Sequence, residues 1–190
     1  MKSSRTAGAW TARTLSPCIS ENPRRRKNIK EAKSGSTLLH LRRMKVADVP
    51  AVRAIEIASF PNPWSDGTFR GEIQNTSISF PLVVVDPAGG DIIGYIIYWH
   101  IRDDVQINSI AVRPDLRGKG IGEAMLRHVM DDVRKKGASF ISLEVRQSNV
   151  RAQALYQKLG FKIIGVRKGY YTKPDEDALV MGMTLGRAPQ

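Results

Sequence analysis

The hexapeptide RGKGIG, residues 117–122, governs how the rest of the chain is interpreted. It follows the apolar, β-branched run VQINSIAV at residues 105–112 and precedes an amphipathic run with helical spacing from Ile121. A helix N-terminus presents unpaired N–H groups and the positive end of a dipole, and glycine lets that backbone approach an anion closely. Arg117 and Lys119 add positive charge. The pattern predicts a cradle for pyrophosphate, and the alternative is a tight turn between a strand and a helix.

Two familiar phosphate-binding loops do not fit this stretch. A P-loop has a glycine separated by four residues from Gly-Lys-Ser/Thr, but Arg113 stands at that position and Gly120 follows the lysine. A dinucleotide-binding fingerprint that starts at Gly118 needs its third glycine where the chain has Glu123. The sequence therefore argues against a nucleoside triphosphatase and against a Rossmann domain.

The pattern of apolar residues outside the loop predicts a mixed α/β sheet with helices on both faces, in the order β-α-α-β-β-β-α-β-α-β-β. The expected strands are residues 37–44, 80–86, 91–102, 105–112, 139–145, 161–171 and 177–185. The expected helices are residues 46–60, a short helix after Ser65, residues 121–136 and residues 150–159. Asp48, Ser65 and Asn149 are placed as N-caps, and Gly137 and Gly160 as helix ends.

Charge divides the chain into two parts. The net charge is +12, and residues 1–36 carry nine Lys/Arg against two acids while holding few large aliphatic residues. Such a segment cannot bury enough apolar surface to fold. We therefore expect a disordered basic extension at residues 1–36, with a transit peptide as the alternative, and one folded domain at residues 37–190.

Composition excludes several further classes. The longest apolar run, residues 92–101, is too short to span a bilayer, which takes roughly 20 residues. Cys18 is the only cysteine, so an internal disulfide and a Cys-based zinc site are excluded, and the three histidines lack ligand spacing. We expect no membrane contact, no metal and a cytoplasmic location.

A third loop pattern does fit, namely Arg/Gln-x-x-Gly-x-Gly/Ala directly after a strand that ends IAVRP. This loop resembles the acyl-CoA loop of the GNAT family of N-acetyltransferases. The segment SLEVRQSNVRAQALYQKLGFK is similar to the segment that follows the next strand in that family. The resemblance covers residues 38–185, and it implies the GNAT fold, with strands that splay apart at the acyl-CoA site.

The resemblance implies acetyl-CoA as cosubstrate and assigns a set of contacts to it. The pantetheine arm is expected against the strand backbone, whose amides are also the expected oxyanion donors, and the pyrophosphate against the glycine loop. The residues concerned are Ile110, Ala111 and Val112 in the strand, Arg117, Gly118, Lys119, Gly120, Ile121, Gly122 and Glu123 in the loop, and Asn149. Glu123 departs from the arginine that some members have there, which removes one cation from the expected phosphate site.

Glu144 is the candidate general base. Strand alternation places Ile141, Leu143 and Val145 on one face and Glu144 on the other, beside Arg146. A carboxylate with a pKa near ~4.3 is a weak base towards an amine unless burial raises its pKa or a water relays the proton. The alternative is a strand carboxylate paired with Arg146 or another cation, and the match to the family's LEVR segment favours catalysis.

Tyr156 is the candidate general acid for the departing thiolate. It lies seven residues after Asn149, so the two share a helix face. The resemblance implies that the tyrosine of ALYQKLGF lies beside the sulfur of acetyl-CoA. From the residues alone, a packed tyrosine beside Ala152 and Leu159 is the preferred explanation of this position, and only the resemblance favours catalysis.

The substrate is expected from two further stretches, NPWSDGTF near Pro63 and YYTKPDEDALVM near the C-terminus. They resemble the bacterial branch of the family that acetylates the N-terminal alanine of a ribosomal protein. Trp64, Tyr170 and Tyr171 are the candidate groove residues, and the alternative is that they pack as core or surface aromatics. One alternative is a family member that acts on a small-molecule amine or a lysine side chain. The others are a non-catalytic acetyl-CoA-binding module and a ribosome- or RNA-binding protein that uses PRRRKNIK, although nucleic acid is not required.

Overall fold

A seven-stranded mixed sheet organises residues 39–186, which are the residues that the computed structural model describes. The strands are β1 (His40–Arg43), β2 (Ser79–Val85), β3 (Ile92–Ile101), β4 (Asp104–Val112), β5 (Phe140–Arg146), β6 (Lys162–Thr172) and β7 (Asp175–Thr184). The helices are α1 (Val49–Ile57), α2 (Asp66–Gln74), α3 (Ile121–Lys135) and α4 (Val150–Lys158), with short 3-10 turns at Val46–Asp48 and Pro114–Leu116. This order confirms the predicted one. The predicted basic extension at residues 1–36 lies outside the described residues.

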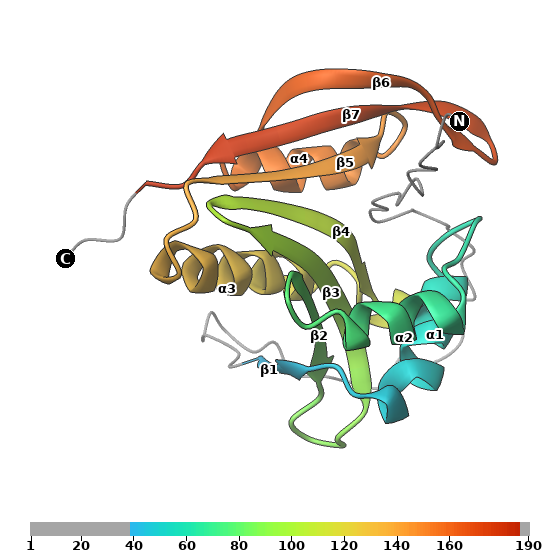
Figure 1. The fold of residues 1–190 in the computed structure, drawn as a ribbon. Helices are drawn as coiled ribbons and strands as arrows, with labels where there is room; N and C mark the ends of the chain where they lie inside the picture. Colours follow the sequence, from blue (N-terminus) through green and yellow to red (C-terminus); the bar gives the residue numbers. More distant parts are fainter. Residues whose placement is uncertain (1–38, 187–190) are drawn as a thin grey trace, which may run out of the picture.

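The sheet has the spatial order β1-β2-β3-β4-β5-β7-β6 and is antiparallel except between β4 and β5. β4 and β5 pair over only four positions, from Asp104 with Phe140 to Ile107 with Leu143. Beyond that point β4 continues along β3 and β5 continues along β7, so the two strands separate (Figure 1). This confirms the predicted splay between the strands.

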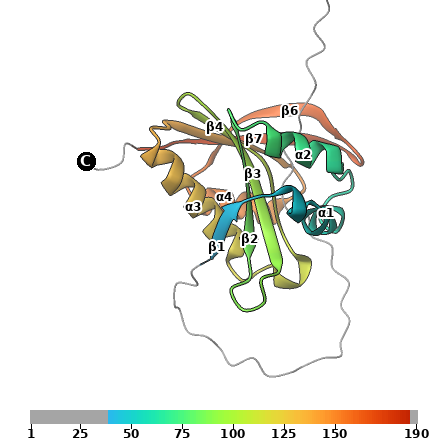
Figure 2. The same cartoon turned by 60° about the horizontal axis from the view of Figure 1, so that its bottom comes forward.

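Helices cover both faces of the sheet, as predicted. Figure 2 shows α3 and α4 on one side and α1 and α2 on the other. Because strand side chains alternate between faces, Ile96 and Tyr98 of β3 pack in the α3/α4 core while Tyr95 and Ile97 pack in the α1/α2 core. β3 is buried on both faces at these positions, which explains its continuous apolar run.

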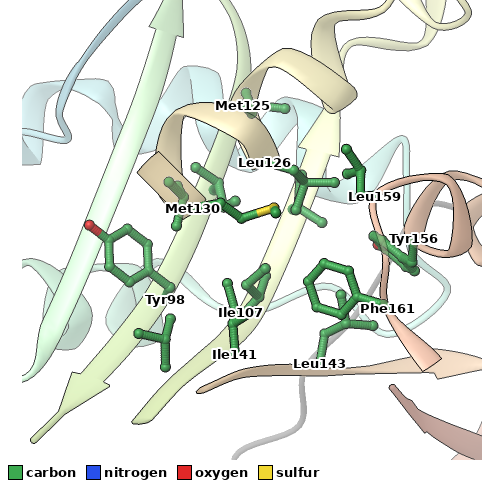
Figure 3. Packing of buried hydrophobic residues seen from close by; sticks show 14 of the residues in the cluster. Tyr98, Ile107, Met125, Leu126, Met130, Ile141, Leu143, Tyr156, Leu159 and Phe161 are labelled. Atoms are coloured by element: carbon green, nitrogen blue, oxygen red, sulfur yellow. The ribbon is translucent and has the colours of Figure 1, made fainter. Parts of the chain in front are cut away.

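The α3/α4 core is the larger of the two, and Figure 3 shows its packing. The residues of α3 buried in it are Met125, Leu126, Val129, Met130 and Val133. Ile121 and the other residues of the first turn, up to Ala124, are only half-buried. The fully buried face of α3 therefore begins at Met125 and leaves the N-terminal turn partly accessible.

Helix ends follow their capping residues with one exception. Ser65 Oγ accepts a hydrogen bond from the Thr68 N–H at 3.1 Å, and Asn149 Oδ1 accepts one from the Ala152 N–H at 3.2 Å. Asp48 stands before α1 but does not cap it. Its carboxylate instead accepts hydrogen bonds from Arg42 at 2.6 and 2.9 Å, because a bidentate guanidinium binds a carboxylate more strongly than an amide does.

Candidate active site

The glycine loop forms the N-terminus of α3. Gly118 and Gly120 have φ of +83° and +81°, a left-handed conformation that side chains with a Cβ resist. Gly120 is the N-cap of the helix, and no side chain caps the end there. A Cβ built on Gly120 would have no atom within 4 Å. The backbone N–H groups of the first turn therefore face open space, as a cradle for an anion requires.

A pocket of about 260 Å³ joins this loop to the end of β4 and the start of α4. Its lining residues are Val112, Leu116, Arg117, Gly118, Gly120, Ile121, Gly122, Glu123, Asn149, Arg151 and Leu155. Eight of them were expected at the cofactor site from the sequence. Ile110, Ala111 and Lys119 were also expected and do not line the pocket.

Arg117 lines the pocket but turns its side chain inward. Its Nε donates to the carbonyl oxygen of Val112 at 3.1 Å, and its Nη2 donates to Ser59 Oγ at 2.7 Å. Ser59 is buried just after α1. The guanidinium therefore ties the loop to β4 and α1, and the charge expected from Arg117 at the phosphate site is used within the protein.

Arg151 is a pocket cation that the sequence reasoning missed. It lies in the first turn of α4, and its Nη2 comes within 3.0 Å of the position that a Cβ on Gly118 would take. The signal was available, because Arg151 follows Asn149, which was already assigned to the site, by only two residues.

Glu123 lies in the first turn of α3, where its charge would repel a phosphate. Its carboxylate accepts hydrogen bonds from Lys158 at 2.7 Å and from Arg127 at 2.9 Å. These two partners hold the pKa of Glu123 below its usual value. The negative charge is therefore offset by two neighbouring cations.

The end of β4 exposes backbone rather than side chains to the splay. Ile110 and Val112 point their side chains into the α3/α4 core, and Ala111 points into the other core. The pairing of β4 with β5 ends at Ile107, and the register against β3 shifts by one residue at Asn108. The backbone of residues 108–112 therefore borders the gap between β4 and β5.

Glu144 lies on β5 just after the pairing with β4 ends. Ile141, Leu143 and Val145 pack in the α3/α4 core, so strand alternation turns Glu144 to the opposite face, as predicted. The side chain is 2% exposed, and Oε1 lies 3.2 Å from Nη2 of Arg167. Burial raises the pKa of the Glu144 carboxyl, although Arg167 and a hydrogen bond from Gln106 oppose that rise.

The alternative partner proposed for Glu144, Arg146, has other contacts. Arg146 binds Glu176 at 3.0 Å and the carbonyl oxygens of Lys173 and Pro174 in the β6–β7 turn. Its guanidinium also stacks over the Tyr171 ring at 4.0 Å. Arg146 thus fixes the β6–β7 hairpin to β5 beside Glu144.

Tyr156 lies on the opposite side of the splay from Glu144. It is fully buried on α4 and packs against Phe161, with the two ring centroids 5.9 Å apart (Figure 3). Asn149, its expected neighbour on the helix face, is also buried at the helix N-cap. The candidate base therefore lies just past the β4–β5 pairing, and the candidate acid lies in the α3/α4 core on the other face of the sheet.

The expected groove aromatics have different environments. Trp64 is buried in the α1/α2 core, 5.5 Å from the ring of Phe69, which favours the structural interpretation of this residue. Tyr171 is buried, and Tyr170 is half-buried against it with ring centroids 5.1 Å apart. Only Tyr170 and Tyr171 lie on the strand that carries Arg167, the ion-pair partner of Glu144.

Glu56 is a buried carboxylate that sequence reasoning did not single out. It is fully buried on α1 and accepts hydrogen bonds from the Trp64 N–H at 2.8 Å and from the Tyr95 hydroxyl. The Tyr95 hydroxyl lies 3.0 Å from Ser109 Oγ on β4. An acidic residue between Ile55 and Ile57 was the available signal. The network fixes the loop after α1 against β3 and β4.

Residues 39–186 contain neither a candidate group of metal ligands nor a candidate membrane-spanning helix. This part of the chain has no group of three or more His, Cys, Asp or Glu placed to hold a metal ion. None of the described helices is long and apolar enough to cross a membrane. The expectation that no metal takes part stays a prediction.

Comparison with known proteins gives consistent matches. Residues 49–161 match the model of the acetyltransferase (GNAT) family. The chain is 39% identical over 145 residues to a Bacillus subtilis (strain 168) protein to which alanine N-acetylation of ribosomal protein bS18 is provisionally ascribed, with 76% of this chain and 95% of the relative covered. It is 34% identical over 144 residues to the ribosomal protein bS18-alanine N-acetyltransferase of Escherichia coli (strain K12), covering 75% and 95%.

A solved structure agrees with the sequence relatives. The crystal structure of the ribosomal-protein-S18-alanine N-acetyltransferase from Escherichia coli superposes with a TM-score of 0.72 at 31% identity. The match covers 80% of this chain and 97% of that one. The chain therefore shares its overall fold with that enzyme.

Proposed function

Because the chain belongs to the acetyltransferase (GNAT) family, we propose that it transfers the acetyl group of acetyl-CoA to the α-amine of a protein's N-terminal alanine. The proposed substrate is a small-subunit ribosomal protein, because the names of the relatives give ribosomal protein bS18 as the protein that those relatives acetylate. One observation carries the proposal most directly. Glu144, just past the β4–β5 pairing, and Tyr156, in the α3/α4 core, lie on opposite faces of the sheet, one on the side proposed for each reactant.

The described residues fit acetyl-CoA. The left-handed glycines at the start of a 15-residue helix leave space that a Cβ would fill, and Arg151 adds a cation beside them. Residues 117–123 and Arg151 would hold the pyrophosphate, and the backbone of residues 110–112 would border the pantetheine arm. When bound, acetyl-CoA supplies an acyl carbon activated by its bond to sulfur.

The residues of this chain have three tasks in the transfer. Glu144 accepts the proton of the α-ammonium, and burial suits it to this because a raised pKa makes a carboxyl a stronger base. Amides of β4 beyond Ile107 donate to the oxygen on which negative charge develops. Tyr156 gives its hydroxyl proton to the departing thiolate in a buried environment.

The test is mass spectrometry of products formed from acetyl-CoA. The acceptors are peptides that begin with alanine, serine, methionine or glycine, a peptide with a blocked N-terminus and an internal lysine, and a polyamine. We expect acetylation of the α-amine, fastest on alanine, and a much lower rate with Glu144→Gln. Acetylation of lysine or the polyamine instead would support the small-molecule or lysine alternative, and absence of any product with retained acetyl-CoA binding would support a non-catalytic module.

Three further assignments accompany this function. The partner is a protein N-terminus, with no membrane and no required nucleic acid, and weak nucleic-acid contact would come from the basic residues of 1–36. A cytoplasmic location follows from a ribosomal protein as substrate. The catalytic domain is residues 37–190, and the extension at residues 1–36 is dispensable for acetylating a short peptide.

A further inference from the structure

Glu144 is covered by a cation that remains largely in water. Arg167 on β6 lies 3.2 Å from the carboxylate, and its side chain is 53% exposed while that of Glu144 is 2% exposed. Gln106 on β4 also donates to Glu144, at 3.3 and 3.5 Å, but carries no charge. The guanidinium of Arg167 is therefore the charged and solvent-accessible member of the group around the base.

The other ionisable groups near Glu144 are buried or already engaged. Arg146, two residues along β5, is held by Glu176 and by the β6–β7 turn. The Tyr171 ring lies under Arg146, and burial raises the pKa of its hydroxyl well above its ordinary value. Tyr170 packs against Tyr171 and, at 5.4 Å, against the guanidinium of Arg167. None of these three side chains has the exposure that lets Arg167 move into water.

Regular pairing across β7 fixes the face from which Arg167 projects. Arg167 pairs with Ala178 of β7, and Ala178 pairs with Arg146 of β5, so Arg167 lies on the same face of the sheet as Arg146 and Glu144. The register against β7 shifts only after Arg167, and Gly169 has φ of +58° in this bulge. Asp177 on β7 accepts a hydrogen bond from the Gly169 N–H at 2.9 Å and one from Lys168 Nζ at 2.6 Å. Lys168, in the bulge, is 84% exposed and stays in solvent.

We propose that Arg167 is a positioning residue that occupies, in the free enzyme, the place beside Glu144 that the substrate's α-ammonium takes. Arg167 moves outward when the ammonium arrives, so the acceptor site selects amines that enter as cations. This inference rests on the proposed function and specifies the ionic form of its substrate.

The exchange is favourable because it never leaves a buried charge alone. A buried carboxylate without a partner is strongly destabilised, so an acceptor that displaced Arg167 without bringing a cation would leave Glu144 unpaired. An exposed guanidinium, in contrast, is readily solvated once it leaves the pair. An incoming ammonium replaces one cation by another, whereas a neutral amine or an acidic group does not.

The protons balance across this exchange. The α-ammonium gives one proton to Glu144 and becomes a neutral amine, which can form the C–N bond as the C–S bond breaks. The nitrogen loses a second proton to solvent when the amide forms, and Tyr156, left as a phenolate after protonating the thiolate, takes one proton back from solvent. Arg167 stays protonated throughout and returns to Glu144 after the carboxyl has released its proton to solvent.

The first measurement is independent of turnover. In full-length protein, the carbon-13 resonance of the Glu144 carboxyl is titrated, with Glu144→Gln used to assign it. Removal of a neighbouring cation removes an interaction that favours the carboxylate, so Arg167→Gln should raise the titration midpoint by about one pH unit. Arg167→Lys should restore most of the parent midpoint. Lys168→Gln, which removes a charge from the bulge beside Arg167, should leave the midpoint unchanged.

The second measurement is the pH profile of kcat/KM with an alanine peptide. Arg167→Gln should move the acidic limb to higher pH, with roughly a tenfold loss below the parent midpoint. Above it, the peptide KM should fall because no guanidinium has to be displaced. Equal midpoints in the parent and Arg167→Gln, or an equal shift in Lys168→Gln, would overturn the inference. A parent that acetylates no N-terminus would refute the proposed function instead, and the titration would still decide whether Arg167 is the partner of Glu144.

Discussion

The two sides of the splay between β4 and β5 differ in the groups that form the site. On the α3/α4 side, the pocket is built around backbone, namely the left-handed glycines, the uncapped end of α3 and the last residue of β4, with Arg151 beside them. On the α1/α2 side, the site consists of charged side chains, with Glu144 held by Arg167 and flanked by Arg146. A backbone site depends on conformation, whereas a charged site depends on partners from distant strands. Substitutions on the two sides should therefore impair the enzyme in different ways.

The largest expected effect belongs to Tyr156, in the core on the α3/α4 side. Tyr156→Phe keeps the ring in its buried position against Phe161 but removes the proton donor. We expect kcat to fall by on the order of 10²–10⁴ while the KM for acetyl-CoA changes much less, because the lost interaction forms only in the transition state. A pH–rate profile with an alanine peptide measures both. Parent-like turnover at every pH would mean that the hydroxyl is structural.

Glu144→Gln should give a defect that depends on pH. At pH 7 we expect a rate about a hundredfold below the parent, because the amine no longer has a base. An α-amine has a pKa near ~7.7–8.0, so about a tenth of it is neutral at pH 7 and alkali can restore about tenfold. The Tyr156→Phe defect should not be relieved in this way. If the Glu144→Gln defect stayed constant up to high pH, the carboxylate would position the acceptor rather than take its proton.

A smaller effect, confined to the backbone side, is expected at the two ends of α3. Gly120→Val and Gly137→Val both place a Cβ at a left-handed residue, with φ of +81° and +87°, and neither Cβ meets a neighbouring atom. Each should cost about 1–2 kcal/mol of folding stability, measured by urea unfolding. Only Gly120→Val should also weaken acetyl-CoA binding, by roughly tenfold in calorimetry. Equal affinities for the two variants would contradict the cradle.

The contrast between the two sides also explains what the sequence could predict. The order of elements, the caps at Ser65 and Asn149 and the glycine loop were all found because each depends on neighbours within a few residues. The inward turn of Arg117 was missed, since its partner Ser59 lies 58 positions away. The pairing of Glu144 with Arg167 was missed for the same reason, because Arg167 lies on β6, which meets β5 only across β7. Hydrophobic periodicity predicts which face a residue is on, but not which cation lies opposite it.

The short, four-position pairing of β4 with β5 has a consequence for how the two reactants enter and leave the active site. The strands part after Ile107 and Leu143, and beyond that point β4 continues beside β3 and β5 beside β7. In the proposed arrangement each reactant enters and leaves by its own face, so neither blocks the route of the other. Direct transfer between two bound reactants then needs no acetylated enzyme, and initial-rate plots should give lines that intersect. Parallel lines would instead indicate an acetylated enzyme intermediate, formed from acetyl-CoA before the acceptor peptide binds.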